Sequence, residues 1–257
     1  QVNLTRFNLF FPEKREFFLE NQGSFQIGGF TPSNSNLVPF FSRTIGLSDT
    51  GTPIPIVGGL RLTGRVGRSN IGVLNMQTER EERPGLTSLP AANFTVMRYN
   101  RNLFSQSSAG VFLMNKERGD IANRLVGGEV RFSPTRSFTV DGLVMASEKT
   151  GFDSGSAWRT GVQYDPGLTS YSFNYTSLGE TFKDDLGFIP REGVDITTAG
   201  VLQRIRPKAT ARVVREFGAN LAYGRFSRAG VGTETGFLSP SLNIEFNDAS
   251  RLSVAMQ

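Results

Sequence analysis

Hydrophobic and polar side chains alternate along most of this chain with a period of two residues. In the segment 168–178, Tyr171, Phe173 and Tyr175 alternate with serine, asparagine and threonine. Successive side chains of a β-strand point to opposite faces, so this pattern predicts strands with one apolar and one polar face. The alternation predicts strands at 37–47, 54–67, 70–79, 92–102, 106–117, 124–133, 137–148, 156–165, 168–178, 192–206, 209–225, 234–247 and 250–257.

The lengths of these strands and of their connections favour a membrane-spanning sheet. Most of the strands approach or exceed the ~9–11 residues that a tilted strand needs to cross a bilayer. The connections alternate between short ones, such as 67–69 and 165–168, and long ones, such as 179–191 and 226–233. Short periplasmic turns and longer extracellular loops are typical of outer-membrane barrels. The pattern therefore predicts an all-β, antiparallel transmembrane (outer-membrane) β-barrel.

The predicted strands do not complete such a barrel. Bacterial single-chain barrels normally have an even number of strands, so we expect at least about 14 in the full protein. The last predicted strand, 250–257, does not end in an aromatic residue, and we expect the missing part to follow it.

The short turn at 67–69 also predicts the orientation of the chain. It directs the strand 54–67 toward the periplasm, and the strand 37–47 must then run outward. Residues 1–36 are accordingly expected to form a periplasmic linker or plug segment, and residues 37–257 to form the barrel.

The polar faces of the strands carry charges that lipid would not accept. Arg or Lys facing lipid at mid-membrane costs ~2–4 kcal/mol per residue. We therefore expect the charged faces to point into the lumen. There they form either a ladder that holds the wall together or a polar path for a solute. The lumen-facing candidates are Arg61, Arg65, Glu129, Arg131, Asp141, Arg159 and Gln163.

Composition removes most enzyme chemistry. The 257-residue chain has no Cys and no His, which excludes Cys nucleophiles, disulfides, His-dependent triads and zinc sites of the Cys/His type. The formal charge is +5, but the arginines are spread singly along the chain, unlike the basic patch of a nucleic-acid-binding protein. There is no phosphate-binding glycine motif. We expect no catalytic residues, no metal, no cofactor and no nucleic-acid partner.

The stretch FFPEKREFFLENQGSF, residues 10–25, combines aromatic rings with charges. Pro12 could take the first helical position and Gly23 could end the helix, which predicts a two-turn helix with Phe11 and Phe18 on one side. A helix this short needs a docking surface, so it either caps the periplasmic mouth or lies inside the lumen as a partial plug. The expected plug or docking residues are Phe11, Pro12, Glu13, Lys14, Arg15, Phe18 and Glu20.

The longest outer loop contains DDLGFIPREG, residues 184–193. Its candidate site residues are Asp184, Asp185, Arg191 and Glu192. Two interpretations are open: an ordered loop with a proline turn, or a metal or carboxylate site. The second would allow a carboxylate-based glycan hydrolase on the outer loops.

Five segments carry a resemblance to a known family. They are residues 10–25, FFSRTIG at 40–46, PIPIVGGLRLTGRVG at 53–67, GVLNMQT at 72–78 and DDLGFIPREG at 184–193. Together they resemble a group of bacterial proteins of uncharacterised function, frequent in Bacteroidetes, Acidobacteria and relatives. These proteins look like an N-terminal sugar-binding β-sandwich, of the family-9 carbohydrate-binding kind, joined to an outer-membrane barrel. This chain resembles the barrel part.

The resemblance and the strand pattern lead to the same expectations. The main one is an outer-membrane barrel that passes a solute or handles it at the surface, with a glycan as one candidate. The alternative is a plugged scaffold barrel that anchors a periplasmic binding domain or an envelope complex. The expected partners are outer-membrane lipid, the protein's own upstream periplasmic domain and other envelope proteins.

Overall fold

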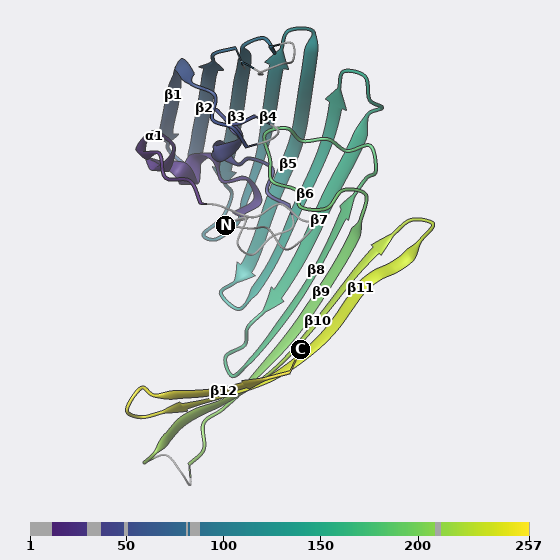
Figure 1. The fold of residues 1–257 in the computed structure, drawn as a ribbon. Helices are drawn as coiled ribbons and strands as arrows, with labels where there is room; N and C mark the ends of the chain where they lie inside the picture. The colour runs from purple at the N-terminus through teal and green to yellow at the C-terminus, as the bar shows by residue number, and fades with distance from the viewer. Residues whose placement is uncertain are drawn as a thin grey trace. The chain divides into compact units, whose positions relative to one another are not determined.

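The computed structural model describes residues 12–29, 37–48, 51–80, 82, 88–208 and 212–256. Within them, twelve strands form one antiparallel sheet in which every strand pairs with its neighbours in sequence (Figure 1). The prediction of an all-β antiparallel fold is confirmed. Among the described residues β1 and β12 each have a single neighbour, so the sheet is not closed. The strands are β1 (Ile56–Val66), β2 (Ser69–Thr78), β3 (Ala92–Asn102), β4 (Ser108–Arg118), β5 (Ile121–Thr135), β6 (Phe138–Lys149), β7 (Gly155–Tyr164), β8 (Thr169–Leu178), β9 (Asp195–Ile205), β10 (Val214–Arg228), β11 (Gly232–Phe246) and β12 (Arg251–Ala255).

The predicted strand at 37–47 is wrong. Val38 makes an isolated bridge to Phe188, Ser42–Thr44 is a 3₁₀ turn (η3), and Leu47 bridges to Pro53. The apolar side chains of this segment are buried by contact with a distant loop rather than by a strand ladder. For example, the Phe41 and Phe188 ring centroids lie 5.8 Å apart. The other twelve predicted strands correspond to β1–β12.

The predicted two-turn helix is also wrong. The helix α1 is a single turn, Glu16–Leu19, with Arg15 rather than Pro12 preceding it. It is followed by the 3₁₀ turns η1 (Gln22–Phe25) and η2 (Ile27–Gly29), so Gly23 lies inside η1. Asn21 is left-handed, with φ 53°, and separates the helix from η1. Phe11 lies outside the described residues.

The alternation of connection lengths holds only in part. The connections at 79–91 and 179–194 are long, as expected, but β4 and β5 are joined by the turn Gly119–Asp120 on the same side of the sheet. Gly119 supplies the left-handed conformation, with φ 58°, that such a tight turn needs. The predicted long loop 226–233 is largely strand, and the connection shrinks to 229–231. Loop length is therefore a weaker argument for orientation than the sequence indicated.

The chain divides into two compact units, each described here by itself. The first contains Gln1–Val130, Leu143–Trp158 and Leu178–Gly193, and the second contains Arg131–Gly142, Arg159–Ser177 and Val194–Gln257. The boundaries cut across strands β5–β8 rather than falling at residue 36. The division into a segment 1–36 and a barrel 37–257 stays a prediction.

In the first unit the two faces of the sheet differ in how far their side chains are buried. One face, called the covered face below, contributes buried side chains such as Leu74, Phe94 and Met114. Residues 12–29, called the N-terminal segment below, contribute the buried side chains of Phe25 and Ile27. Leu186 of the β8–β9 connection is buried as well. The N-terminal segment, purple in Figure 1, lies beside β1–β4, and η1 contacts β2 and β3. The core of this unit therefore lies between one face of the sheet and these irregular segments.

The opposite face, called the outer face below, is apolar but exposed. Leu60, Leu62 and Val111 each expose about 60 % of their surface. In the second unit, strand pairing brings Tyr171, Val201 and Leu221 together on a face that is likewise exposed. The described residues include no helix that is long and apolar enough to cross a membrane.

Candidate functional site

The candidate site is the covered face of the first unit, where the N-terminal segment docks. Phe18 and Phe25 of this segment are buried. The Phe25 ring lies directly over Gly72 of β2, where an added Cβ would meet the ring and the Ser24 carbonyl oxygen at 3.0 Å. Residue 72 must be small for η1 to approach the strand this closely. The aromatic rings thus hold the segment against the sheet.

A buried ion pair lies beneath η1 and η2. Glu129 of β5 and Arg98 of β3 expose 6 % and 11 % of their side chains, and Arg98 Nη2 lies 2.6 Å from Glu129 Oε1. Arg98 Nε donates to the same oxygen, at 2.6 Å, and the Gly28 N–H donates to Glu129 Oε2. Arg98 Nη1 donates to the carbonyl oxygens of Gly23 and Ser24, at 3.4 and 3.3 Å. Both charges therefore bind the backbone of the N-terminal segment as well as each other.

A second ion pair fastens α1 to the edge strand. Arg61 of β1 pairs with the Glu20 carboxylate and also donates to the Phe17 and Glu20 carbonyl oxygens. Its guanidinium carbon lies 4.8 Å from the centroid of the Phe17 ring. The Arg61 guanidinium therefore contacts a carboxylate, two carbonyl groups and an aromatic ring of the N-terminal segment.

A third cluster joins the start of the segment to η3. Glu13, whose side chain is only 4 % exposed, pairs with Arg15 at 2.6 Å and accepts a hydrogen bond from the Ser42 hydroxyl at 2.8 Å. Arg15 also donates to the carbonyl oxygens of Ile45 and Ser42. Burial alone would raise the pKa of Glu13, but hydrogen bonds from Arg15 and Ser42 outweigh it and lower the pKa to about 2. Glu13 is thus a charged group that holds two irregular segments together.

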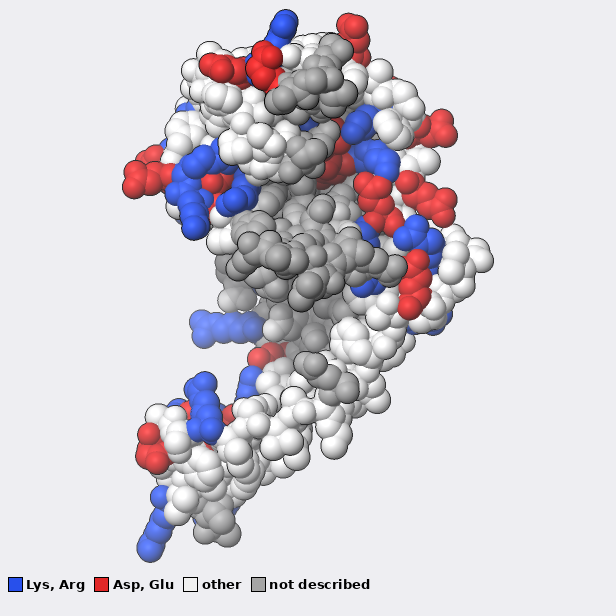
Figure 2. Space-filling view, viewed as in Figure 1, with Lys and Arg blue, Asp and Glu red and all other residues white. Residues whose placement is uncertain are grey.

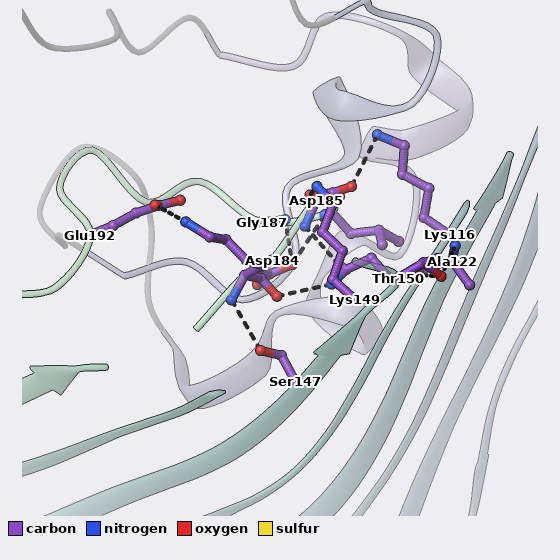
Figure 3. Close-up of polar contacts among 12 residues, drawn as sticks. Lys116, Ala122, Ser147, Lys149, Thr150, Asp184, Asp185, Gly187 and Glu192 are labelled. Atoms are coloured by element: carbon purple, nitrogen blue, oxygen red, sulfur yellow. Dashed lines mark hydrogen bonds and ion pairs between the residues drawn. The ribbon is translucent and has the colours of Figure 1, made fainter. Parts of the chain in front are cut away.

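The DDLGFIPREG loop folds onto the same unit (Figure 3). Asp185 pairs with Lys149 of β6 at 2.7 Å and with Lys116 of β4 at 3.8 Å. Its backbone N–H donates to Asn123 of β5, at 2.9 Å, and the Lys183 N–H donates to the Ser147 hydroxyl, at 3.0 Å. Three neighbouring strands therefore hold one short stretch of the loop.

The loop also binds the segment that replaces the predicted strand. The Phe41 N–H donates to the Leu186 carbonyl oxygen at 2.8 Å, and Val38 and Phe188 exchange backbone hydrogen bonds. The β8–β9 connection is thus linked to residues 37–47 as well as to the sheet.

Asp184 is the unusual carboxyl group of the loop. Its Oδ1 accepts the N–H groups of Leu186 and Gly187, at 3.0 and 2.9 Å. Its Oδ2 is enclosed and has no hydrogen-bond partner among the described residues. Burial, reinforced by the neighbouring charge of Asp185, raises the pKa of Asp184 to about 8 in spite of those two hydrogen bonds. Asp184 is therefore mainly protonated at neutral pH and stabilises a turn as a neutral group.

The carboxylates of this loop do not form a common site. Asp185 binds lysines of the sheet, and Glu192 pairs with Lys183 in the loop itself (Figure 3). No group of three or more His, Cys, Asp or Glu in the described part of the chain is arranged to hold a metal ion. Arg191 is half-buried. The contacts are those of an ordered loop, and the carboxylate-based hydrolase stays a prediction that nothing here tests.

The structure separates the predicted lumen-facing residues into three groups. Arg61 and Glu129 take part in docking the N-terminal segment. In the second unit, Arg159 donates to Asn174 at 3.0 Å, and one enclosed oxygen of Asp141 has no hydrogen-bond partner among the described residues. The remaining predicted residues, Arg65, Arg131 and Gln163, are exposed.

The docking residues also differ in their roles. Glu13, Arg15, Phe18 and Glu20 make the contacts described above. The Pro12 carbonyl oxygen accepts a hydrogen bond from Arg43 at 3.0 Å, and Lys14 is exposed.

Sequence reasoning missed the principal partner of Glu129. It named Glu129 only as a lumen-facing charge, whereas the charge that binds Glu129 is Arg98, two strands away. The signal was present, because Arg98 and Asn100 alternate with Tyr99 in β3 and share a face. Figure 2 shows basic and acidic side chains lying next to one another at the surface in the upper part of the view.

Comparison with known protein families, curated proteins and solved structures finds no match to this chain.

Proposed function

We propose that this chain is part of the wall of an outer-membrane β-barrel, and that its N-terminal segment lies inside the barrel as a plug. The protein then acts as a membrane anchor or scaffold for a periplasmic domain rather than as an open pore. The observation that carries the proposal is the contrast between the two faces of the first unit. The outer face exposes apolar side chains, whereas the covered face holds the ion pairs and the docked segment.

Lipid accounts for the outer face better than water does. Large contiguous apolar patches are rare on soluble monomers and mark contact with a protein or a membrane. Here the exposed apolar side chains include Met97 of β3, Leu113 of β4, Val126 of β5 and Val144 of β6. Burial in lipid gains about 25 cal/mol for each Å² of this apolar surface.

The charged residues on the outer face lie near strand ends, where a membrane would tolerate them. Arg101, Glu117, Arg124 and Glu148 all lie within three residues of a strand end. In the inward-facing pair Arg98–Glu129, Arg98 lies four residues and Glu129 six residues from the nearer end of its strand. Charges at mid-membrane are costly, and charges near the interfaces cost little.

The contacts of the N-terminal segment favour a plug over a cap. A cap at the barrel mouth would touch strand ends and turns. Instead, the segment binds Arg61, Gly72 and Arg98, which are interior positions of their strands. Two ion pairs and buried aromatic rings hold it there, so we propose that it stays docked.

Passage of a solute is the second candidate, and one observation favours it. In the second unit, one side-chain hydrogen bond joins Asn174 to Thr198 across β8–β9 and another joins Asn220 to Ser241 across β10–β11. Such a surface suits a water-filled path. Both candidates assume that further strands close the sheet.

Membrane insertion is tested with the full-length protein in detergent. A folded barrel should keep its compact mobility in unheated electrophoresis and shift on boiling. A monomer that stays soluble without detergent would contradict the membrane assignment.

Conductance in planar bilayers separates the plug from the pore. The plugged barrel should give no steady conductance, whereas Arg98→Gln combined with Arg61→Gln should produce open events by loosening the segment. Steady conductance of the unmodified protein would contradict the plug and favour passage. Arg65→Gln, which removes an exposed arginine from the same strand, serves as the control.

A further inference from the structure

A groove on the outer face of the first unit lies outside the contacts described so far. It has a cavity volume of about 520 Å³. The groove is called the lipid groove below. It is lined mainly by Leu113, Asn115, Arg124, Val126, Ala146 and Glu148.

The lipid groove crosses the boundary between apolar and polar rows of the outer face. Strand pairing aligns Val73, Met97 and Leu113 in one row across β2–β4. Two residues further along the strands, it aligns Asn75, Thr95 and Asn115 in the next row. The first row is apolar and the second consists of amides and a hydroxyl. In the proposed membrane, such a boundary is the depth at which acyl chains meet head groups.

The shape of the groove follows from one small side chain. Ala146 of β6 lies between Val144 and Glu148, the next residues on the same face, and all three are exposed. Leu113 and Val126 supply larger side chains on the neighbouring strands β4 and β5. The short methyl group of Ala146 leaves a depression with apolar walls, which suits a hydrocarbon chain.

The polar end of the groove offers one cation and two acceptors. Arg124 is 65 % exposed and lies 3.7 Å from Glu117, a loose pair that leaves most of the guanidinium free to bind an anion. Glu148 is exposed and has no ion pair in the part of the chain that the structure describes. Asn115 Oδ1 has no hydrogen-bond partner within the same residues. This oxygen is enclosed, and rotation of the amide group would present it to the groove.

We infer that the lipid groove binds a phospholipid with a primary ammonium head group, of the phosphatidylethanolamine type. The phosphate pairs with Arg124, the ammonium group donates to Glu148 and to Asn115, and one acyl chain lies over Ala146 between Leu113 and Val126. A trimethylammonium head group has no N–H to donate, and a glycerol head group has no positive charge for Glu148. This inference rests on the proposed membrane location.

Native mass spectrometry of the full-length protein in detergent tests the inference. The protein is titrated separately with phosphatidylethanolamine, phosphatidylcholine and phosphatidylglycerol. We expect one phosphatidylethanolamine to bind about tenfold more tightly than either of the others, because two charge-assisted hydrogen bonds are lost with them. Equal binding of the three lipids would overturn the inference.

Matched variants locate the binding. Ala146→Phe fills the depression, and Glu148→Gln removes the negative charge that pairs with the ammonium group, so both should abolish the preference. Val144→Phe adds the same ring to the same face of β6 outside the groove and should leave the preference intact. Loss of the preference in Val144→Phe, or its retention in Ala146→Phe, would contradict the assignment.

The two proposals fail in different ways. Heat-modifiable mobility reports whether the protein forms a membrane-inserted barrel at all. A protein that passes this test and binds the three lipids equally contradicts only the lipid groove. A protein that fails it contradicts the proposed function as well.

Discussion

At the scale of single residues, the docking site depends on carboxyl groups whose environments differ sharply. The Glu13 and Glu129 side chains are buried and each is paired with an arginine, so each has a positive partner. Asp184 is buried with backbone N–H groups at one oxygen and no hydrogen-bond partner among the described residues at the other. Burial disfavours a charge unless partners compensate, so the pKa of the carboxyl group is lowered at Glu13 and raised at Asp184.

Asp184 should make folding less stable as the pH rises. Its pKa is about 8 in the folded chain and 3.8 ordinarily, so between these values only the folded state keeps the proton. Stability from this group is therefore full below pH 3.8, falls up to about pH 8 and is level above it. Asp184→Asn keeps the acceptor for Leu186 and Gly187 and removes the titration.

Urea unfolding at pH 5, 7 and 9 measures this effect, with the fluorescence of the single tryptophan, Trp158, as the signal. The variant should gain stability over the unmodified protein as the pH rises toward 8. An equal difference at all three pH values would contradict the buried-carboxyl interpretation.

Glu13 should have the opposite pH dependence. Its pKa is lowered to about 2 from 4.5, so it contributes stability above pH 4.5 and loses that contribution as the pH falls through 2. Glu13→Gln should therefore weaken docking of the N-terminal segment at pH 7 and have little effect near pH 2. Exposure of Arg15 to trypsin reports docking at neutral pH, and Lys14→Gln, at an exposed neighbour, is the control.

The Arg98–Glu129 pair should be strongly coupled. Removing one partner of a buried ion pair leaves the other charge uncompensated and typically costs about 3–5 kcal/mol. Glu129→Gln and Arg98→Gln should each lower the free energy of unfolding by about that much, and the double variant should cost less than the sum. Additive losses in this double-mutant cycle would show that the two side chains do not act as a pair.

At the scale of elements, local patterns predicted the strands better than they predicted the segments on top of them. Alternation is a property of each strand, so β1–β12 could be found without knowing their neighbours. The segment 37–47 was misread because its apolar side chains are buried by Phe188 and Leu186, almost 150 residues away. Arg98 was missed for the same reason, since its partners lie in η1 and β5. Contacts between distant segments leave no local period in the sequence.

The close approach of η1 to β2 gives a prediction at this scale. Gly72→Val would place its side chain against the Phe25 ring and the Ser24 carbonyl group, and η1 would have to move. We expect faster trypsin cleavage in residues 12–29 while the strands remain protected. Gly64→Val, in the neighbouring strand where no atom lies within 4 Å of an added Cβ, should leave cleavage unchanged. Equal cleavage of both variants would argue against the docked position of η1.

At the scale of the whole molecule, the proposed function depends on which solvent each face of the sheet meets. The sequence alternation predicted two unlike faces, and the structure shows apolar side chains on an exposed face in each unit. It does not close the sheet, so the number of strands in a barrel stays a prediction. The absence of cysteine lets single introduced thiols report the environment of each face without background.

Paired thiols on β10 provide that test in the full-length protein in lipid vesicles. Leu221→Cys lies on the exposed apolar face and Asn220→Cys on the opposite face, next to Ser241. If lipid covers the apolar face, a charged water-soluble maleimide should label residue 220 and leave residue 221 unmodified until detergent is added. The two positions are adjacent in one strand, so differences in local folding cannot separate them. Equal labelling in vesicles would mean that water reaches both faces, and the sheet would then require a protein partner rather than a membrane to cover its apolar surface.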